Sequence, residues 1–508
     1  MRKFVLVLVV LSMIIAGLGI AKDTVVINLQ AEPSRLNPII YQDTETSMVL
    51  ESIYAPLLDL TEDGDFTTEG AVTERFTISD DGLVYTFYIK QGIKFHNGDP
   101  LTARDVKFSY ESFMDPDLGS PHNRYYAGIE EIVLVDDYTL EIHLKELDIA
   151  FLTLARLRGA VMPKDYIESV GWDEYERHPI GAGPYKFVRR VPAQSIELKR
   201  FEDYFGENAK IENVVFRYYP EMSTAIMAIR AGQVDFIGEL PTDEFNALKR
   251  TAGDDLNFGT YERFEDHRVV FNKRPGEPFA DVLVRQAVNY AIDRSEIIAL
   301  TRPGMATPAV GRVPTFHPAH AADAPAYEVD LDKARELLIE AGYPDGFKTQ
   351  IFAPSNHRER VLEVQQIQRQ LARIGIEAEV VAVEWGTYLD VTADGEAPMF
   401  RERWSASAPE PISFIESWHS ESSWNPIFGT YYNEEVDRLV DLIRVTIDTE
   451  ERWELYREVQ RIAMEDAVCV PLYYPLVGEA YNKDLYIPED LWNPFKRPIS
   501  AVHRWEWR

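Results

Sequence analysis

Cysteine is nearly absent from this chain of 508 residues, which contains only Cys469. An intramolecular disulfide is therefore excluded. No cysteine lies near the N-terminus, where a bacterial lipid anchor would need one, so we expect a protein without a lipid anchor. Cys469 lies in the apolar run 467–470, where a buried, inert thiol is the simplest interpretation.

Positive charge is also scarce, with 52 Lys and Arg residues against 84 Asp and Glu and a net charge of -32. A surface with this excess of negative charge repels the phosphates of nucleic acids and anionic lipid head groups. We therefore expect no nucleic-acid partner and no binding to an anionic membrane surface.

Long hydrophobic runs are missing except at the N-terminus, where Phe4 to Ile20 follows Arg2 and Lys3 and precedes Ala21. A charged start, an apolar middle and a small residue at cleavage spacing are typical of a secretory signal peptide. We expect cleavage after residue 21 and export to the periplasm. The alternative is an uncleaved anchor, although about 17 apolar residues lie at the short end of what spans a bilayer.

Recognisable catalytic motifs are missing too. The turn 181–184 lacks the third glycine of a dinucleotide fingerprint, and no Gly-x-Ser-x-Gly elbow occurs. His317 and His320 have no adjacent glutamate at zinc-binding spacing, and we interpret them as exposed loop histidines.

The acidic cluster of Glu262, Glu265 and Asp266 does not have the spacing of a calcium loop, and we interpret it as a solvated face. We therefore predict no catalytic, metal or cofactor site and no enzyme activity. A secreted glycoside hydrolase stays open as an alternative, because its two carboxylates need not be adjacent in sequence.

The residues that are present predict a mixed α/β protein. The chain is longer than one hydrophobic core usually organises, so two or three domains are expected. Thr102 and Asp105 form a capping-box pattern before a helix expected at 103–113, and Asp330 caps an apolar helical face that stops at Gly342. A hairpin turn is expected at 80–82. Further strands and helices are predicted at 24–29, 83–89, 282–300, 360–374, 378–383 and 435–465.

Strands that alternate with helices favour sheets covered on both faces, with ligands bound in crevices at strand ends or between domains. The predicted fold class is therefore α/β, with mixed sheets flanked by helices.

Two segments, DGLVYTF at 81–87 and KFHNGDPLTARDV at 94–106, identify a family. They are similar to the signature of the family 5 extracellular solute-binding proteins, which are the dipeptide and oligopeptide-binding receptors of ABC importers. Shorter matches follow in the family's order at 36–38, 179–185, 231–235, 279–281, 284–287 and 291–294. The resemblance spans essentially the whole chain after residue 21.

The resemblance implies a two-lobed periplasmic binding protein of the type II kind, with an extra third domain and a ligand cleft between the lobes. The implied parts are lobe I at 22–55, 180–275 and 476–508, the extra domain at 56–179, and lobe II at 276–475. Two crossing segments are expected near Phe271-Asn272 and Tyr474-Pro475. Ligand would close the hinge by contacting both lobes at once. The expected partners are a small solute and the transmembrane subunits of an ABC importer, and the protein is expected to be a monomer.

The segment 401–414 gives the most informative match for the pocket, because it ends in the family's Glu-Pro-x-Ser-Phe pattern. In that register, Trp404 falls on the family's ligand-contacting tryptophan and Arg401 on its nearby arginine. Ser407 falls where peptide receptors carry the aspartate that binds the α-amino group of the peptide. Arg403 replaces a glycine whose backbone meets the ligand.

The identity of residue 407 affects the predicted ligand, because a buried ammonium needs a paired carboxylate and Ser407 cannot supply that charge. Glu410 or Glu416 could supply it from another direction, so an oligopeptide stays the favoured prediction. An oligosaccharide is the alternative, since sugars need aromatic faces and tryptophans gather in this half of the chain, at Trp385, Trp404, Trp418 and Trp424.

Further candidate contacts lie outside this segment. Gln42, Asp43 and Thr44 follow 36–38 at the place where the family's N-terminal strand lines the cleft, although they could equally form an exposed turn. Tyr473 and Tyr474 either line the cleft or pack the hinge beside the second crossing. Trp385 completes the predicted set of ligand contacts.

Overall fold

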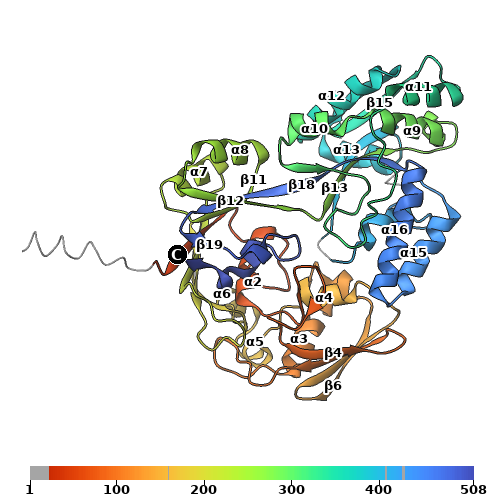
Figure 1. Cartoon of the computed structure of the whole chain (residues 1–508). Coiled ribbons are helices and arrows are strands. Elements are labelled where there is room, and N and C mark those ends of the chain that lie inside the picture. The colour runs from red at the N-terminus through yellow and green to blue at the C-terminus, as the bar shows by residue number, and fades with distance from the viewer. Residues whose placement is uncertain (1–21, 158, 407–408, 426–428) are drawn as a thin grey trace, which may run out of the picture.

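The computed structural model describes residues 22–157, 159–406, 409–425 and 429–508. The predicted signal peptide at 1–21 and the predicted pocket residue Ser407 lie outside these ranges. The fold is α/β with mixed sheets and two lobes, as predicted (Figure 1). No helix in the described part of the chain is both long enough and apolar enough to cross a membrane.

A sheet of 12 strands runs through both lobes. In lobe I the strands follow the order β11 (Phe236–Leu240), β1 (Thr24–Leu29), β10 (Asn213–Tyr218), β9 (Ser195–Arg200) and β8 (Tyr185–Val191). In lobe II the order is β13 (Glu265–Phe271), β17 (Met399–Ser405), β15 (Phe347–Pro354) and β16 (Ile376–Val383). The long strand β18 (Cys469–Asn482) lies between β11 and β13, and also pairs with β12 (Leu256–Glu262) and β14 (Ala306–Pro308).

Strand β18 joins the two lobes, and Figure 1 shows it as one long arrow running between them. Its residues 476–482 pair with β12, whereas its residues 469–475 pair with β13 and β14. The change of partner falls at the predicted second crossing. The first crossing lies at 263–264, between β12 and β13, because both strands pair with the same β18. The predicted position at Phe271-Asn272 is therefore wrong, since it is the far end of β13.

Strand β1 of lobe I is packed on both faces. Strand β1 lies parallel to β10 and β11. Val25 and Ile27 pack in the cluster that includes α2 (Thr44–Ile53), and Val26 packs against the cluster of α7 (Met222–Arg230) and α8 (Thr242–Thr251). A parallel sheet covered on both faces needs such aliphatic strands.

The helices of lobe II are α9 (Val282–Ala291), α10 (Arg294–Thr301), α11 (Leu331–Glu340), α12 (Arg358–Ala372), α13 (Trp385–Ala393), α14 (Ile412–Ile415), α15 (Glu434–Val445) and α16 (Thr449–Glu465). Two predicted long helices are each divided into two. Asp293 caps α10 and Asp448 caps α16, each by accepting from a main-chain N–H. An aspartate that bonds its own backbone in this way competes with helix continuation, which breaks 282–300 and 435–465.

The extra domain contains an antiparallel sheet in the order β4 (Thr73–Ile78), β5 (Val84–Ile89), β7 (Thr139–Leu144) and β6 (Ile129–Asp136). Helix α3 (Ala103–Met114) lies beside it and begins with the predicted capping box of Thr102 and Asp105. The β4–β5 hairpin turns at the predicted position, where Gly82 has a φ of 71°. Ile447 of lobe II lies against Gly82, so the extra domain also touches lobe II.

The remaining helices and strands are short: β2 (Asp59–Leu60), β3 (Phe66–Thr67), α4 (Phe151–Leu157), α5 (Lys164–Val170), α6 (Trp172–Arg177), β19 (Leu485–Tyr486) and β20 (Glu506–Trp507). The C-terminal segment includes a 3-10 stretch at Pro498–Arg504 that packs on α2. Cys469 is buried, as predicted, and burial raises the pKa of its thiol.

Candidate functional site

Strand β17 holds the centre of the predicted pocket. It pairs antiparallel with β13, so that Arg401 lies opposite Val269 and Trp404 lies opposite Asp266. Successive side chains of a strand point to opposite faces, which places Arg401 and Arg403 on one face and Trp404 on the other. The predicted residues of this strand therefore have two different environments.

Arg401 lies inside lobe II, and its guanidinium is bound by protein groups. Its side chain is 0% exposed, and its Nε lies 2.6 Å from the carboxylate of Glu363, which is equally buried. The Tyr473 hydroxyl donates to the same carboxylate at 2.5 Å. Burial would lower the pKa of Arg401, but the attraction of Glu363 outweighs it and raises the pKa. The structure thus brings Arg401 and Tyr473 together, within the core.

Arg403 is the exposed end of the same polar network. Its side chain is 44% exposed and lies 3.0 Å from the carboxylate of Glu265. The other oxygen of Glu265 lies 2.5 Å from Nε2 of His267, whose Nδ1 faces Arg401. Burial and the charge of Arg401 lower the pKa of His267 to about 4, so this ring is neutral at neutral pH. A chain of polar contacts therefore leads from the surface to Arg401.

Two of the three acidic residues that we predicted to be solvated are buried. Glu265 and Asp266 are 3% and 1% exposed, because β13 lies between β17 and β18. Asp266 lies 2.6 Å from Arg268 and 3.3 Å from Arg312. Each buried carboxylate has an arginine partner, which is the condition under which a charge can be buried.

The prediction for His317 is also wrong, because this histidine is only 3% exposed. Its ring stacks on Phe264, with 5.4 Å between ring centroids. Phe495 of the C-terminal segment lies 6.2 Å from Phe264 and 5.3 Å from Phe316. This aromatic cluster joins the first crossing, lobe II and the C-terminal segment. Sequence reasoning missed it, since its members are distant in the chain and share no motif.

Trp404 is half-buried at the edge of the lobe II core. Its ring lies 5.3 Å from that of Trp424, which is 42% exposed, so these two residues form a partly exposed aromatic surface. Trp418 is 3% exposed and belongs to the core. Trp385 is 36% exposed and stacks on Tyr388, which places it at the start of α13.

The N-terminal candidates lie at the start of α2. Asp43 is the N-cap of this helix and accepts from the Thr46 N–H at 2.7 Å. It also accepts from Ser34, and although partial burial opposes them, these bonds lower the pKa of Asp43. Gln42 and Thr44 are exposed. Asp43 therefore has a structural role, and the other two are accessible.

Three other groups considered for the pocket have protein partners. Tyr474 is 0% exposed, and its hydroxyl donates to a main-chain carbonyl at 2.9 Å. Glu410 is 5% exposed and lies 3.1 Å from Arg452. Glu416 lies 3.1 Å from Arg444. Both carboxylates that could replace the aspartate missing at position 407 are thus already paired.

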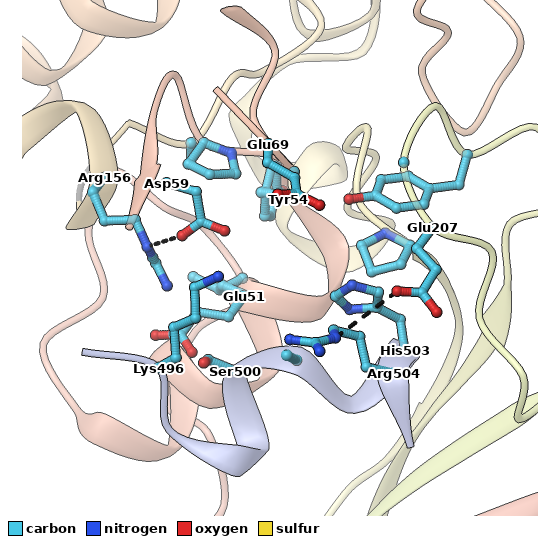
Figure 2. A pocket seen from close by; sticks show the side chains of 18 of the residues that line it. Glu51, Tyr54, Asp59, Glu69, Arg156, Glu207, Lys496, Ser500, His503 and Arg504 are labelled. Atoms are coloured by element: carbon cyan, nitrogen blue, oxygen red, sulfur yellow. Dashed lines mark ion pairs between the residues drawn. The ribbon is translucent and has the colours of Figure 1, made fainter. Parts of the chain in front are cut away.

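A cavity of about 560 Å³ lies between lobe I, the extra domain and the C-terminal segment (Figure 2). Its walls come from α2, the loop 204–207 and residues 490–504, together with parts of the extra domain. None of its described lining residues belongs to 276–475, and none belongs to the predicted contact set. It is therefore distinct from the surface that bears Trp404 and Arg403. Within the described ranges, no group of three or more His, Cys, Asp or Glu residues could hold a metal ion.

This chain is similar to known proteins over nearly its whole length. Residues 67–426 match the family model described as bacterial extracellular solute-binding proteins, family 5 middle. The glutathione-binding protein GsiB of Salmonella paratyphi A is 31% identical over 496 residues, which cover 95% of both chains. GsiB of Escherichia coli O157:H7 is 29% identical over the same length and coverage.

Solved structures give the same result. HbpA2 from Haemophilus parasuis has a TM-score of 0.85 and 26% identity, covering 96% of this chain and 100% of that one. DppA from Helicobacter pylori in complex with the peptide STSA has a TM-score of 0.72 and 28% identity, covering 96% and 98% of the two chains.

Proposed function

The chain belongs to the bacterial extracellular solute-binding proteins of family 5, and from this premise we propose that it is the periplasmic substrate-binding protein of an ABC importer. In this proposal it captures an oligopeptide-like solute between lobes I and II and delivers it to the transmembrane subunits of the importer. The observation that supports this most is the similarity to named glutathione-binding proteins over 95% of both chains.

The arrangement of the lobes suits this role. The lobes share β18, and the only other crossing in the described chain is the short link 263–264. A hinge this narrow allows one lobe to rotate against the other. A ligand that contacts both lobes then favours the closed state, because those contacts are absent from the open one.

We infer the ligand class from the relatives and from Arg403 and Trp404, two of the accessible residues of β17. GsiB is named for glutathione, and DppA of Helicobacter pylori holds the peptide STSA. In our proposal Trp404 packs on the ligand, and Arg403 pairs with a ligand carboxylate from its exposed position beside Glu265. The two residues lie on opposite faces of β17, and the ligand reaches both along the edge of residues 403–405, where β17 pairs with β13 but not with β15. Glu410 is a weaker candidate as counter-ion for the ligand's amino group, because it is buried and paired with Arg452, whereas Glu416 is paired with Arg444 at the surface.

An oligosaccharide is the second candidate, and the partly exposed pair of Trp404 and Trp424 is the observation that favours it. Aromatic faces of this kind suit sugar rings as well as apolar side chains. The two candidates differ in charge, because a sugar needs no cation, whereas a peptide carboxylate needs one. Arg403 therefore discriminates between them.

Isothermal titration of the mature protein with glutathione, the peptide Ser-Thr-Ser-Ala and maltotetraose tests the proposal. We expect peptide binding, and expect Trp404→Ala to weaken it by about 2 to 4 kcal/mol, the range of buried aromatic anchors. Arg403→Gln should weaken peptide binding and leave sugar binding unchanged. Trp172→Ala, a half-buried tryptophan of the extra domain, is the matched control. Sugar binding without peptide binding would establish the second candidate.

The remaining parts of the proposal are export, monomeric state, binding without turnover, and the domain bounds given above with one change, since lobe I ends and lobe II begins at the crossing 263–264. The family consists of binding proteins, and incubation of the pure protein with peptides and chromogenic glycosides tests turnover in this chain directly. Product that increases in proportion to protein concentration would refute that part and favour the glycoside hydrolase alternative. Small-angle scattering with and without ligand tests two further points. The molecular mass reports on the monomeric state, and a smaller radius of gyration with ligand reports closure of the lobes.

A further inference from the structure

The cavity between lobe I and the extra domain contains charged groups of both signs. Asp59 and Arg156 form an ion pair at 2.6 Å on one side, and Arg504 lies 3.8 Å from Glu207 on the other (Figure 2). Arg504 is also bonded to Asp490. These groups already have protein partners, so the choice of ligand depends on the charged groups whose partners are incomplete.

Two further charged groups in the cavity are not fully used by the protein. One carboxylate oxygen of Glu51 lies 3.1 Å from Arg497, while its buried Oε2 has no hydrogen-bond partner among the described residues. Lys496 lines the same end of the cavity, and its ammonium forms no ion pair with another described residue. Figure 2 shows both side chains in the same part of the cavity, Glu51 on α2 and Lys496 on the C-terminal segment. A carboxylate and an ammonium side by side suit the ammonium and carboxylate of one small molecule.

Aromatic rings form a further part of the walls, beside aliphatic side chains and the charged residues Glu69 and Lys90. The cavity is lined by Tyr41, Tyr54, Phe113, Tyr204 and Phe205. His503 adds a ring that is neutral at neutral pH, because burial lowers its pKa to about 4. A volume of about 560 Å³ falls within the range of small-molecule sites, which are mainly apolar with a few placed polar groups.

We propose that this cavity is a second binding site, which takes a compact zwitterion of the free α-amino acid class. Lys496 receives its carboxylate, Glu51 receives its ammonium after a small rotation of the carboxyl group, and the rings hold its side chain. The site is separate from the cleft between the lobes, because no described lining residue comes from lobe II. The proposal does not depend on the ligand proposed for that cleft.

The test is isothermal titration of the mature protein with the standard L-amino acids, one at a time. We expect at least one to bind. Lys496→Gln and Glu51→Gln should each weaken that binding by about tenfold or more, the effect of losing one charged hydrogen bond. Lys496→Gln is the safer variant for folding, since Lys496 is half-exposed. Glu51→Gln keeps the shape of the side chain that meets Arg497.

The cleft variant Trp404→Ala separates the two sites. It should leave amino-acid binding unchanged, while Lys496→Gln should leave binding of Ser-Thr-Ser-Ala unchanged. An amino acid whose binding is lost in Trp404→Ala but kept in Lys496→Gln would lie in the cleft, and the proposal would be overturned. Absence of binding by every amino acid would overturn it as well. Failure of Ser-Thr-Ser-Ala to bind would count against the proposed function alone.

Discussion

The two halves of the large sheet differ in the charged groups that their central strands bury beside an apolar core. In lobe I, β1 buries Val25, Ile27 and Leu29 against apolar neighbours. In lobe II, the central strands β13 and β17 bury ion pairs, of which the pair of Arg401 and Glu363 is the deepest. Apolar packing loses stability in proportion to the atoms removed. Removal of one partner of a buried ion pair costs more stability than the atoms removed would suggest, because it leaves an unpaired charge in the core.

This difference has a consequence for function. The polar network of lobe II ends at Arg403, which the proposed function assigns to the ligand. The position of that side chain is fixed by Glu265, and Glu265 is fixed in turn by His267. Substitutions in the lobe II network should therefore affect both stability and ligand binding, whereas substitutions in β1 should affect stability alone.

Removal of Arg401 should produce the largest loss of stability. Arg401→Met leaves the carboxylate of Glu363 buried without its arginine, which costs about 3 to 5 kcal/mol. Urea unfolding followed by tryptophan fluorescence measures the loss. The double variant Arg401→Met with Glu363→Met should recover most of it, because no unpaired charge remains. A single variant as stable as the wild type would mean that the pair does not support lobe II.

Glu479 is a buried carboxyl of lobe I, 2% exposed on β18. Burial raises its pKa from 4.5 to about 8, so the folded state holds this proton more tightly than the unfolded state. The stability that the carboxyl contributes at low pH should be lost as the pH rises from about 4.5 to about 8. The variant Glu479→Gln has no titrating group at this position. At alkaline pH its free energy of unfolding should therefore exceed that of the wild type by up to a few kcal/mol.

Thermal unfolding of both proteins across this pH range measures the gain. Glu197→Gln, at a half-exposed position on β9, is the control and should follow the wild type. A constant difference between Glu479→Gln and the wild type at every pH would show that Glu479 is ionised in the folded protein.

The buried residue His96 should make stability depend on pH in the opposite direction to Glu479, and by a smaller amount. Burial lowers the pKa of His96 from 6.5 to about 4, and its Nε2 lies 3.0 Å from the Gly183 carbonyl. The unfolded chain binds this proton first, so stability should fall as the pH drops from about 6.5 to about 4. His96→Asn should reduce that fall by about 1 to 3 kcal/mol, measured as the difference in unfolding free energy between the two ends of the range. An equal fall in both proteins would assign it to other groups.

The smallest effect is expected for a conservative change in β1. Ile27→Val removes one methylene group from a fully buried side chain, at a cost of about 1 kcal/mol. The loss should be equal at acidic and neutral pH, and titration with Ser-Thr-Ser-Ala should give the wild-type affinity. A change in affinity would show that the core of lobe I is coupled to the cleft, which would weaken the contrast between the lobes.

Local patterns in the sequence predicted much of the fold. The capping box of Thr102 and Asp105 and the hairpin turn at 80–82 depend on neighbouring residues, so their sequence signals were sufficient. The helices predicted at 282–300 and 435–465 were too long, because Asp293 and Asp448 each cap a second helix, a local signal that the prediction did not use. The acids of β13 were judged solvated, since nothing in the local sequence shows that arginines from elsewhere face them.

The candidate site was less predictable than the fold. Of the contacts predicted on β17, Arg403 and Trp404 are accessible and stay a prediction, whereas the same strand turns Arg401 into the core. That outcome depends on which face of β17 meets α12, where Glu363 lies. The cavity of Figure 2 gave no sequence signal, because its walls come from segments distant in the chain.

The sequence by itself determined the family, the class of fold and the places where single helices and turns begin, because these depend on signature motifs and on contacts between near neighbours. Only the tertiary structure decided which charged residues are buried, where β18 exchanges partners, and which residues surround the cavity. The physical reason is that the pKa, exposure and pairing of a side chain depend on the groups that the fold brings within a few ångströms of it, and in this protein those groups come from distant parts of the chain.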